Sequence, residues 1–111
     1  MPLVSVIIPA YNPGRYLDEA VQSVIAQIFT DWECLVVDDG STEDLSRVER
    51  MDSRVRLIRQ KNGGTQAAGD NGTLTSGGEF IVFLDHDDIW LPAKLEKQVA
   101  GLRGNAAAER E

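Results

Sequence analysis

Three carboxylates crowd the end of one apolar run, FIVFLDHDDIW at residues 80–90, as Asp85, Asp87 and Asp88. Like charges this close repel one another, and each costs free energy to remove from water. Mg²⁺ or Mn²⁺ takes oxygen ligands and leaves coordination positions for water and for substrate phosphates. A metal that joins a carboxylate to a diphosphate would relieve the repulsion and stabilise negative charge on a departing diphosphate. We therefore favour a ligand-binding role for Asp85 and Asp87.

Local structure offers a simpler interpretation of some acids. An aspartate at a strand end can cap the turn or helix that follows, and for Asp88 capping explains the residue as well as catalysis does. Asp38 and Asp39 precede Gly40 and Ser41, a turn where a helix N-terminus would also favour acids. Their chemical use would be to accept hydrogen bonds from a base N–H or a ribose hydroxyl.

The elements that must position these acids are four apolar runs rich in branched residues. Each run is followed by a turn signal and a helical pattern, and together they predict strands within residues 3–9, 32–39, 54–60 and 79–85. The first, second and fourth runs are nearly continuous in Val, Ile, Leu and Phe, which predicts strands buried on both faces. Strands that alternate with helices predict an α/β, Rossmann-like domain with a mainly parallel sheet of about four strands flanked by helices.

The first two helices have recognisable start signals. Asn12 and Pro13 have the residue types of an N-cap and a first-turn proline. Leu17, Val21, Val24 and Ile28 then fall on one helical face. After the second run, Ser41 followed by Asp44 resembles a capping box, and Leu45, Val48 and Met51 recur at helical spacing.

The second half of the chain gives weaker signals until its last helix. Segment 62–78 is rich in glycine, so a helix at 65–76 would be short and intrinsically poor. The glycines could let the backbone approach a phosphate closely, or they could form a flexible loop. Pro92 opens a last helix that is predicted to bury Leu95, Val99 and Leu102. We expect residues 1–103 to form the domain and residues 104–111 to be a disordered tail.

Ligands of such sheets bind outside the carboxyl ends of the strands. This rule places three polar clusters, residues 9–12, 38–41 and 85–88, on one edge. Two common phosphate-binding patterns are missing from the sequence. The glycine-rich segment carries no Lys-Ser or Lys-Thr, so it is not a P-loop, and the turn after the first run lacks Gly-x-Gly-x-x-Gly.

The composition limits the partners and the setting. A net charge of −7 with no basic block argues against binding to nucleic acid or to an anionic membrane. No apolar stretch approaches the roughly 18 residues of a membrane span, and no signal peptide is visible. Cys34 is the single cysteine, which excludes an internal disulfide and fits a reducing compartment. These observations predict a cytoplasmic protein.

Five motifs, taken in order and spacing, resemble the nucleotide-sugar-binding half of family 2 glycosyltransferases, which have the GT-A fold. They are VSVIIPAYN (4–12), SVIAQ (23–27), VVDDGST (36–42), NGG (62–64) and GEFIVFLDHDDIWLPAKLEKQV (78–99). The resemblance covers nearly the whole chain. It implies that Pro9, Ala10 and Tyr11 line a base pocket, largely through backbone. It also implies that Asp39 hydrogen-bonds the base, uracil in many members, and that Asp38 supports the pocket.

The resemblance also implies roles for the acids at the end of the fourth run. Asp85-His86-Asp87 matches the family's Asp-x-Asp motif. Asp85 would lie near the ribose, and Asp87 would coordinate Mn²⁺ or Mg²⁺ on the diphosphate. Asp88 would lie behind these two, near the donor sugar.

The sequence departs from the family pattern in two ways. Many members have Ala-Arg-Asn where this chain has Ala68-Gly69-Asp70, so a cation is replaced by a glycine and a further acid follows. Members also continue well past residue 111, into a half that binds the acceptor and supplies the catalytic base. We therefore expect a truncated glycosyltransferase that binds a nucleoside-diphosphate sugar, with a UDP-sugar favoured.

The family reaction implied by the resemblance is inverting transfer to an acceptor hydroxyl, here unidentified, and its catalytic base is expected beyond residue 111. The alternative is a non-catalytic module that binds a nucleotide or a nucleotide sugar.

Overall fold

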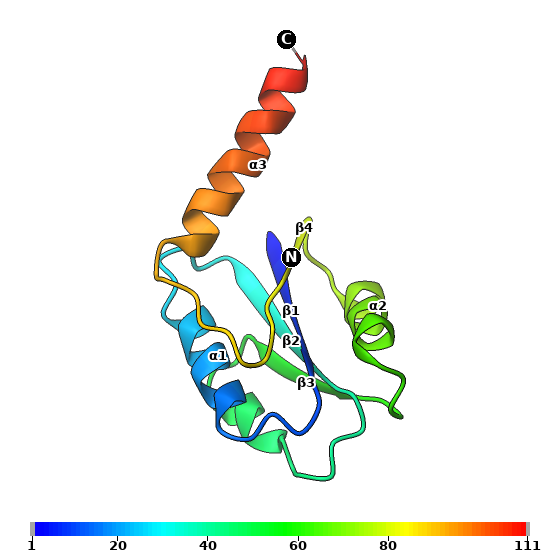
Figure 1. The fold of residues 1–111 in the computed structure, drawn as a ribbon. Coiled ribbons are helices and arrows are strands. Elements are labelled where there is room, and N and C mark those ends of the chain that lie inside the picture. Colours follow the sequence, from blue (N-terminus) through cyan, green and yellow to red (C-terminus); the bar gives the residue numbers. More distant parts are fainter. Residues whose placement is uncertain (1, 111) are drawn as a thin grey trace.

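A computed structural model describes residues 2–110, with the side chains of residues 2–102. Strands and helices alternate along the chain (Figure 1) in the order β1 (Val4–Ala10), α1 (Tyr16–Ile25), β2 (Trp32–Asp38), the 3-10 helix η1 (Ser46–Arg50), β3 (Val55–Arg59), α2 (Thr65–Thr75), β4 (Phe80–Phe83) and α3 (Lys94–Arg110). The strands form one parallel sheet in the order β3-β2-β1-β4. The predicted fold class is confirmed.

Strand β1 lies at the centre of the sheet and fixes its register. It pairs with β2 from Val4 opposite Trp32 to Ala10 opposite Asp38, and with β4 from Val4 opposite Phe80. Residues 4–8 are fully buried, which explains the continuous apolar run, because a central parallel strand is covered on both faces.

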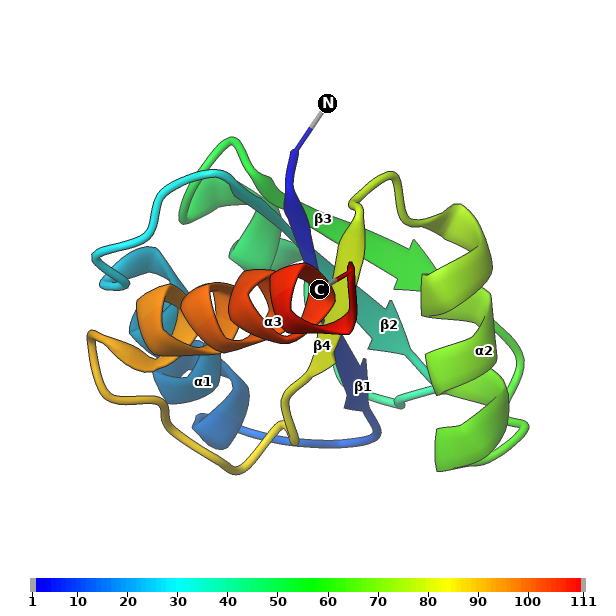
Figure 2. The ribbon, with the colours of Figure 1, turned by 90° about the horizontal axis from the view of Figure 1, so that it is seen from above.

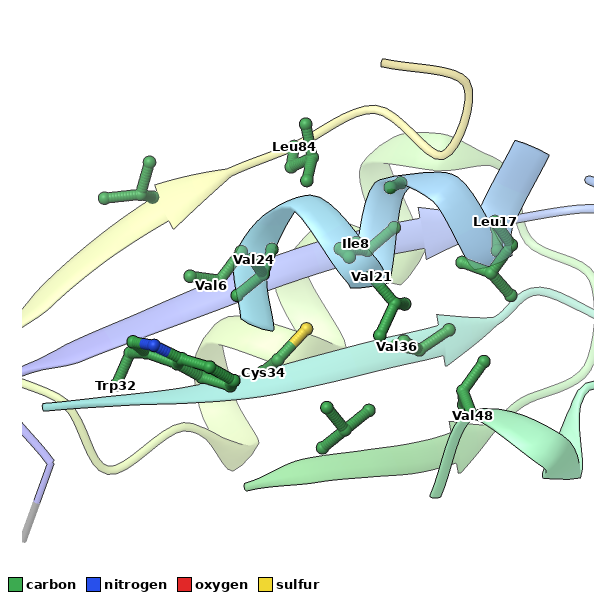
Figure 3. Packing of buried hydrophobic residues seen from close by; sticks show 14 of the residues in the cluster. Val6, Ile8, Leu17, Val21, Val24, Trp32, Cys34, Val36, Val48 and Leu84 are labelled. Carbon is green, nitrogen blue, oxygen red and sulfur yellow. The ribbon is translucent and has the colours of Figure 1, made fainter. Parts of the chain in front are cut away.

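Helices cover the two faces of the sheet unequally (Figure 2). Helix α1, η1 and the start of α3 lie on one face, where alternate β1 residues such as Val6 and Ile8 meet Leu17, Val21 and Val24 of α1 (Figure 3). Helix α2 lies alone on the other face and forms a smaller cluster that contains Ile7, Leu35, Val37 and Ala68. The inward-facing residues predicted for α1 are confirmed except Ile28, which follows the helix and is exposed.

A glycine brings α2 close to the sheet. A Cβ on Gly72 would lie 2.6 Å from Cγ2 of Ile7 and 3.1 Å from Cγ2 of Val37. Because real Cβ atoms do not approach this closely, Gly72 is required for the helix to pack on β1 and β2. The predicted weak helix exists, at Thr65–Thr75, and at this position its glycine serves packing rather than flexibility.

Strand β4 is an edge strand, and the prediction that it is buried on both faces is wrong. Val82 and Leu84 are buried, whereas Ile81 is 37% and Phe83 is 56% exposed. The exposed pair faces the side of the sheet that carries α2, because Phe83 pairs with Ile7 of the smaller cluster, whereas α2 packs over β1 and β2. The apolar run alone could not reveal that its covering helix lies over the neighbouring strands.

The predicted start of α1 is wrong. The helix begins at Tyr16, after Arg15, rather than behind an Asn12 cap and Pro13. Asn12 adopts a left-handed backbone conformation, with φ of 43°, which asparagine tolerates better than most residues. Its side chain bonds to the β2 turn instead of to the helix, as described below.

The capping box predicted after β2 is also wrong. Asp44, not Ser41, accepts the hydrogen bond at the start of η1, where Oδ1 lies 2.8 Å from the N–H nitrogen of Ser46. The element is a single 3-10 segment rather than an α-helix. Of the three residues predicted at helical spacing, Leu45 and Val48 are fully buried and Met51 is partly buried.

Helix α3 begins two residues after Pro92 and buries Leu95 and Val99, whereas Leu102, also predicted to face inward, is 36% exposed. The helix continues to Arg110, through residues 104–110 of the predicted tail. Glu111 lies outside the described residues. The domain boundary at residue 103 stays a prediction.

Candidate functional site

The carboxyl edge of the sheet gathers the predicted site residues. Strands β1 and β2 end side by side, and the backbone N–H of Asp39 donates to the carbonyl of Ala10 at 2.8 Å. On the other side of β1, the N–H of Leu84 donates to the carbonyl of Ile7 at 3.0 Å, so that the chain leaves the sheet just before Asp85. The three polar clusters therefore lie on one edge, as the rule for parallel sheets requires.

The loop after β1 is tied to the turn after β2. Oδ1 of Asn12 accepts hydrogen bonds from the backbone N–H of Thr42 at 2.9 Å and from its hydroxyl at 3.2 Å. In return, the backbone N–H of Asn12 donates to Oγ of Ser41 at 2.9 Å. The neighbouring N–H of Gly14 donates to a carboxylate oxygen of Glu43 at 2.7 Å. These bonds fix the segment that contains Pro9, Ala10 and the exposed Tyr11.

Asp38 supports the turn that follows it. Its side chain is 5% exposed, and Oδ1 accepts the backbone N–H of Ser41 at 2.9 Å. This is the local turn interpretation that the sequence left open for the pair, and it explains an acid two residues before Gly40, whose φ is 81°.

Asp39 anchors a loop that comes more than twenty residues later. Oδ1 accepts Nε2–H of Gln60 and the backbone N–H of Gly63, both at 2.8 Å. Oδ2 accepts the backbone N–H of Gly64 at 3.0 Å and, less closely, Nδ2–H of Asn62 at 3.4 Å. Nδ2 of Asn62 also donates to the backbone carbonyl of Asp39 at 3.0 Å. Loop 60–64, defined by these residues, is therefore organised around one carboxylate.

The hydrogen bonds determine the charge state of Asp39. Burial acts to raise the pKa of its carboxyl, but hydrogen bonds from Gly63, Gln60 and Gly64 outweigh burial, so the pKa lies below its ordinary value. The group is 4% exposed and ionised at neutral pH. Sequence reasoning missed Gln60 and Asn62 as partners, because nothing in their local pattern links them to β2.

A cleft of about 250 Å³ lies between β1, β4 and the start of α2. Pro9, Asp85, Gly69 and Asp70 line it, together with Thr65, Gln66 and Phe83. The structure thus brings Pro9 and Asp85 together beside the two positions that depart from the family pattern. Asp38 lines a different depression, with the turn after β2 and the end of β3.

The acids after β4 are exposed to solvent, and this exposure explains how three negative charges can lie so close together. Asp85, Asp87 and Asp88 all face solvent, so water screens their repulsion and little desolvation is required. Oδ1 of Asp88 accepts the N–H of Ile89 at 3.0 Å, and the N–H of Asp88 donates to the carbonyl of Asp85, also at 3.0 Å. Asp88 therefore makes local contacts within this turn, and its role near the donor stays a prediction.

This acidic segment, residues 85–88, offers the carboxylate oxygens that a hard divalent cation prefers as ligands. Among residues 2–102, no side chain or backbone group forms a hydrogen bond or salt bridge with the carboxylates of Asp85 and Asp87. Their oxygens are free to bind, and exposure allows a metal to keep several waters, as Mg²⁺ and Mn²⁺ do. These residues fit a metal that is completed by ligand oxygens. Within residues 2–102, no three His, Cys, Asp or Glu side chains are grouped to hold a metal by themselves.

The sequence matches the model of glycosyl transferase family 2 over residues 5–108. The chain belongs to glycosyl transferase family 2. A relative in Escherichia coli, the UDP-Glc:alpha-D-GlcNAc-diphosphoundecaprenol beta-1,3-glucosyltransferase WfgD, is 38% identical over 106 residues, which make up 93% of this chain and 42% of WfgD. The match confirms the family that the five motifs predicted.

Two solved glycosyltransferase structures have the same fold as this chain. TarS 1-349 of S. aureus in complex with UDP-GlcNAc is 30% identical with a TM-score of 0.79, over 88% of this chain and 30% of TarS 1-349. The mannosyltransferase PcManGT from Pyrobaculum calidifontis, in complex with GDP-Man and Mn²⁺, is 25% identical with a TM-score of 0.78, over 85% of this chain and 30% of PcManGT.

The chain spans 17% of the length of one curated relative and 42% of another. None of the helices in the described part of the chain has the length and apolarity needed to cross a bilayer.

Proposed function

We propose that this chain binds the nucleoside-diphosphate-sugar donor of an inverting glycosyltransferase, together with a divalent metal. The observation that carries the proposal is the cleft between Pro9 and Asp85, which lies at the carboxyl edge of the sheet beside unpaired, exposed carboxylates. The complexes of TarS with UDP-GlcNAc and of PcManGT with GDP-Man and Mn²⁺ support it. We favour a UDP-sugar, because TarS and WfgD are more similar to this chain than PcManGT is.

The base is assigned to the edge formed by β1, β2 and loop 60–64. Pro9, Ala10 and Tyr11 line its pocket, and Asp39 accepts a hydrogen bond from a base N–H. A carboxylate offers about four acceptor positions, and Asp39 already uses them for loop 60–64. The contact from Asn62 at 3.4 Å is the weakest, so it is the one that the base N–H replaces. Asp38 holds the turn beside the pocket through Ser41.

The diphosphate is assigned to the acidic segment. Asp87 binds Mn²⁺ or Mg²⁺, Asp85 contacts the ribose from the wall of the cleft, and Asp88 holds the turn of the segment near the donor sugar. When bound, the metal neutralises charge on the leaving diphosphate. The acidic walls of the cleft, Asp70 and Asp85, make this neutralisation necessary, because no lysine or arginine lines it. The proposal assigns to this chain donor binding alone.

Calorimetric titration of the chain with UDP, with and without MnCl₂, tests the proposal. We expect Mn²⁺ to strengthen UDP binding, and Asp87→Ala to abolish the metal-dependent part. Asp39→Ala is expected to weaken binding while the metal dependence remains. Asp31→Ala is the matched control, because Asp31 is an exposed acid that precedes β2 at the opposite edge. Equal affinity for UDP with and without Mn²⁺ in the parent chain would contradict the assignment.

A further inference from the structure

Gln27, just after helix α1, is a buried amide with an unusual set of contacts. It is 5% exposed, and its side chain reaches a segment more than sixty residues later. Nε2–H donates to the carbonyl of Leu91 at 2.7 Å and to that of Ser23 at 3.0 Å. Oε1 accepts the backbone N–H of Leu95 at 2.9 Å. Both donors and the acceptor of the amide are therefore used, which fixes its orientation.

One of these contacts replaces a helix cap. The first N–H groups of a helix have no partner within the helix, and a side chain just before the helix commonly satisfies one of them. In α3, the N–H of Leu95 in the first turn is satisfied by Gln27, from another helix. The backbone adds a parallel link, because the N–H of Ile28 donates to the carbonyl of Pro92 at 3.0 Å. The segment just after α1 is thus bonded directly to the segment where α3 begins.

The acidic segment lies between two anchors. On its amino side, Leu84 is 2% exposed and bonded to the carbonyl of Ile7. On its carboxyl side, Trp90 packs against the core, and Leu91 is held by Gln27. The hydrogen bonds inside the segment are local, from Asp88 to Asp85 and from Ile89 to Asp88. They shape the turn, but they do not tie it to the rest of the domain.

We propose that Gln27 is a positioning residue for the acidic segment, and that its amide holds the carboxylates where a metal-bound diphosphate requires them. The role in metal binding rests on the proposed function, whereas the role in ordering the segment does not. Gln27 is too deeply buried to contact a ligand itself. It acts through Leu91 and Leu95, as groups behind metal ligands do when they fix the orientation of the ligands.

Three variants distinguish a specific effect on the acidic segment from a general loss of stability. Gln27→Met keeps a long unbranched side chain and removes all three amide hydrogen bonds. Gln27→Glu keeps an acceptor for Leu95 and removes the donors to Leu91 and Ser23. Val21→Ala is the control, because Val21 is fully buried on α1 within the main core cluster. Truncating this side chain should lower the midpoint of thermal unfolding without releasing the acidic segment.

Backbone order parameters from NMR, recorded without metal or nucleotide, form the first readout. We expect the order parameters of the backbone amides in residues 85–91 to fall from roughly 0.85 in the parent to below about 0.6 in Gln27→Met. Gln27→Glu should lie between the two, and Val21→Ala should match the parent. The second readout is the dissociation constant of Mn²⁺ in the presence of UDP, which Gln27→Met should raise about 10-fold. Metal-free UDP binding should stay within about twofold.

Unchanged order parameters at residues 85–91 in both Gln27 variants would overturn the proposal, as would equal loss of order in Val21→Ala. Equal losses of metal-dependent and metal-free UDP binding in Gln27→Met would also overturn it. If the parent chain fails to bind UDP with Mn²⁺, the proposed function fails, while the order parameters still decide whether Gln27 positions the segment.

Discussion

Asp39 and Asp85 follow two strands that flank β1 at the same edge of the sheet, yet their environments are opposite. Asp39 is 4% exposed, and its carboxylate accepts hydrogen bonds from four residues of loop 60–64. Asp85 is exposed, and its carboxylate bonds to no group among residues 2–102. The first acid organises a loop of the fold through its hydrogen bonds, whereas the second makes no such bond within residues 2–102. A short acidic motif therefore does not by itself show which of its members bind.

The contrast follows from the strands. Strand β2 lies inside the sheet, so the chain after it is covered by neighbouring loops, and a buried carboxylate must be fully hydrogen-bonded. Strand β4 lies at the edge with one uncovered face, so the chain after it stays in water. Position in the sheet, rather than sequence, separates a buried, hydrogen-bonded acid from an exposed acid without a bonding partner.

The largest expected effect compares the two acids directly. Asp39→Ala should lower the free energy of unfolding by about 3 kcal/mol, because it leaves the donors of loop 60–64 without their buried acceptor. Asp85→Ala should change it by less than about 0.5 kcal/mol, as an exposed substitution does. Urea denaturation of both variants measures the difference. Similar losses in the two variants would break the comparison.

A pH series tests whether the charge of Asp39 is the cause. The pKa of Asp39 is lowered in the folded state, so its contribution to stability is present above the unfolded pKa, about 3.9. That contribution is lost as the pH falls through the folded pKa. The stability difference between the parent and Asp39→Asn should stay constant from neutral pH to about pH 5 and shrink below about pH 4. A difference that grows on acidification would reverse the assigned sign.

Asn62→Ala sharpens the role of loop 60–64. The variant removes the bond to the Asp39 carbonyl and the long contact to Oδ2, and it should cost about 1 kcal/mol. Because that contact is the one that the base is proposed to replace, affinity for UDP should fall by less than in Asp39→Ala. Calorimetry on the two variants compares these losses. A larger loss in Asn62→Ala would assign the base contact to Asn62 instead.

Asp88→Ala should have a smaller effect than Asn62→Ala. It removes one exposed hydrogen bond, to the N–H of Ile89, and should lower stability by about 0.5 kcal/mol. Thermal unfolding should detect a shift of a few degrees at most. A loss as large as that of Asp39→Ala would show that the acidic segment also organises the fold.

Much of the fold could be predicted from sequence because periodicity and burial are linked. The continuous apolar runs of β1 and β2 predict covered parallel strands, and the short helix at 65–75 lies within its predicted range. The edge position of β4 was not predictable, because FIVF gives the same pattern whether α2 lies over it or over its neighbours. The start of α1 failed because Asn12 has two competing uses, and a tertiary contact with Thr42 prevailed over a local cap.

The candidate site, too, was predicted only in part. Local motifs identified Asp38, Asp39 and the acidic segment, since a run of acids after a strand is visible in the sequence. The partner that holds Asp39, Gln60, is distant in sequence, and so is Gln27, which we propose positions the acidic segment through Leu91. A glutamine carries no local signal of the carbonyl or carboxylate that it will meet.

The buried thiol of Cys34 can report how often the central strands of the sheet open. The thiol is fully buried in β2, and burial, together with the charge of Glu33, raises its pKa to about 12. A thiolate-selective reagent therefore reacts only after the sheet has opened and exposed the sulfur. Because this is the single cysteine, the labelling rate of the unmodified protein follows the opening of the central strands. Each variant above can then be ranked without a fluorophore or an introduced tag.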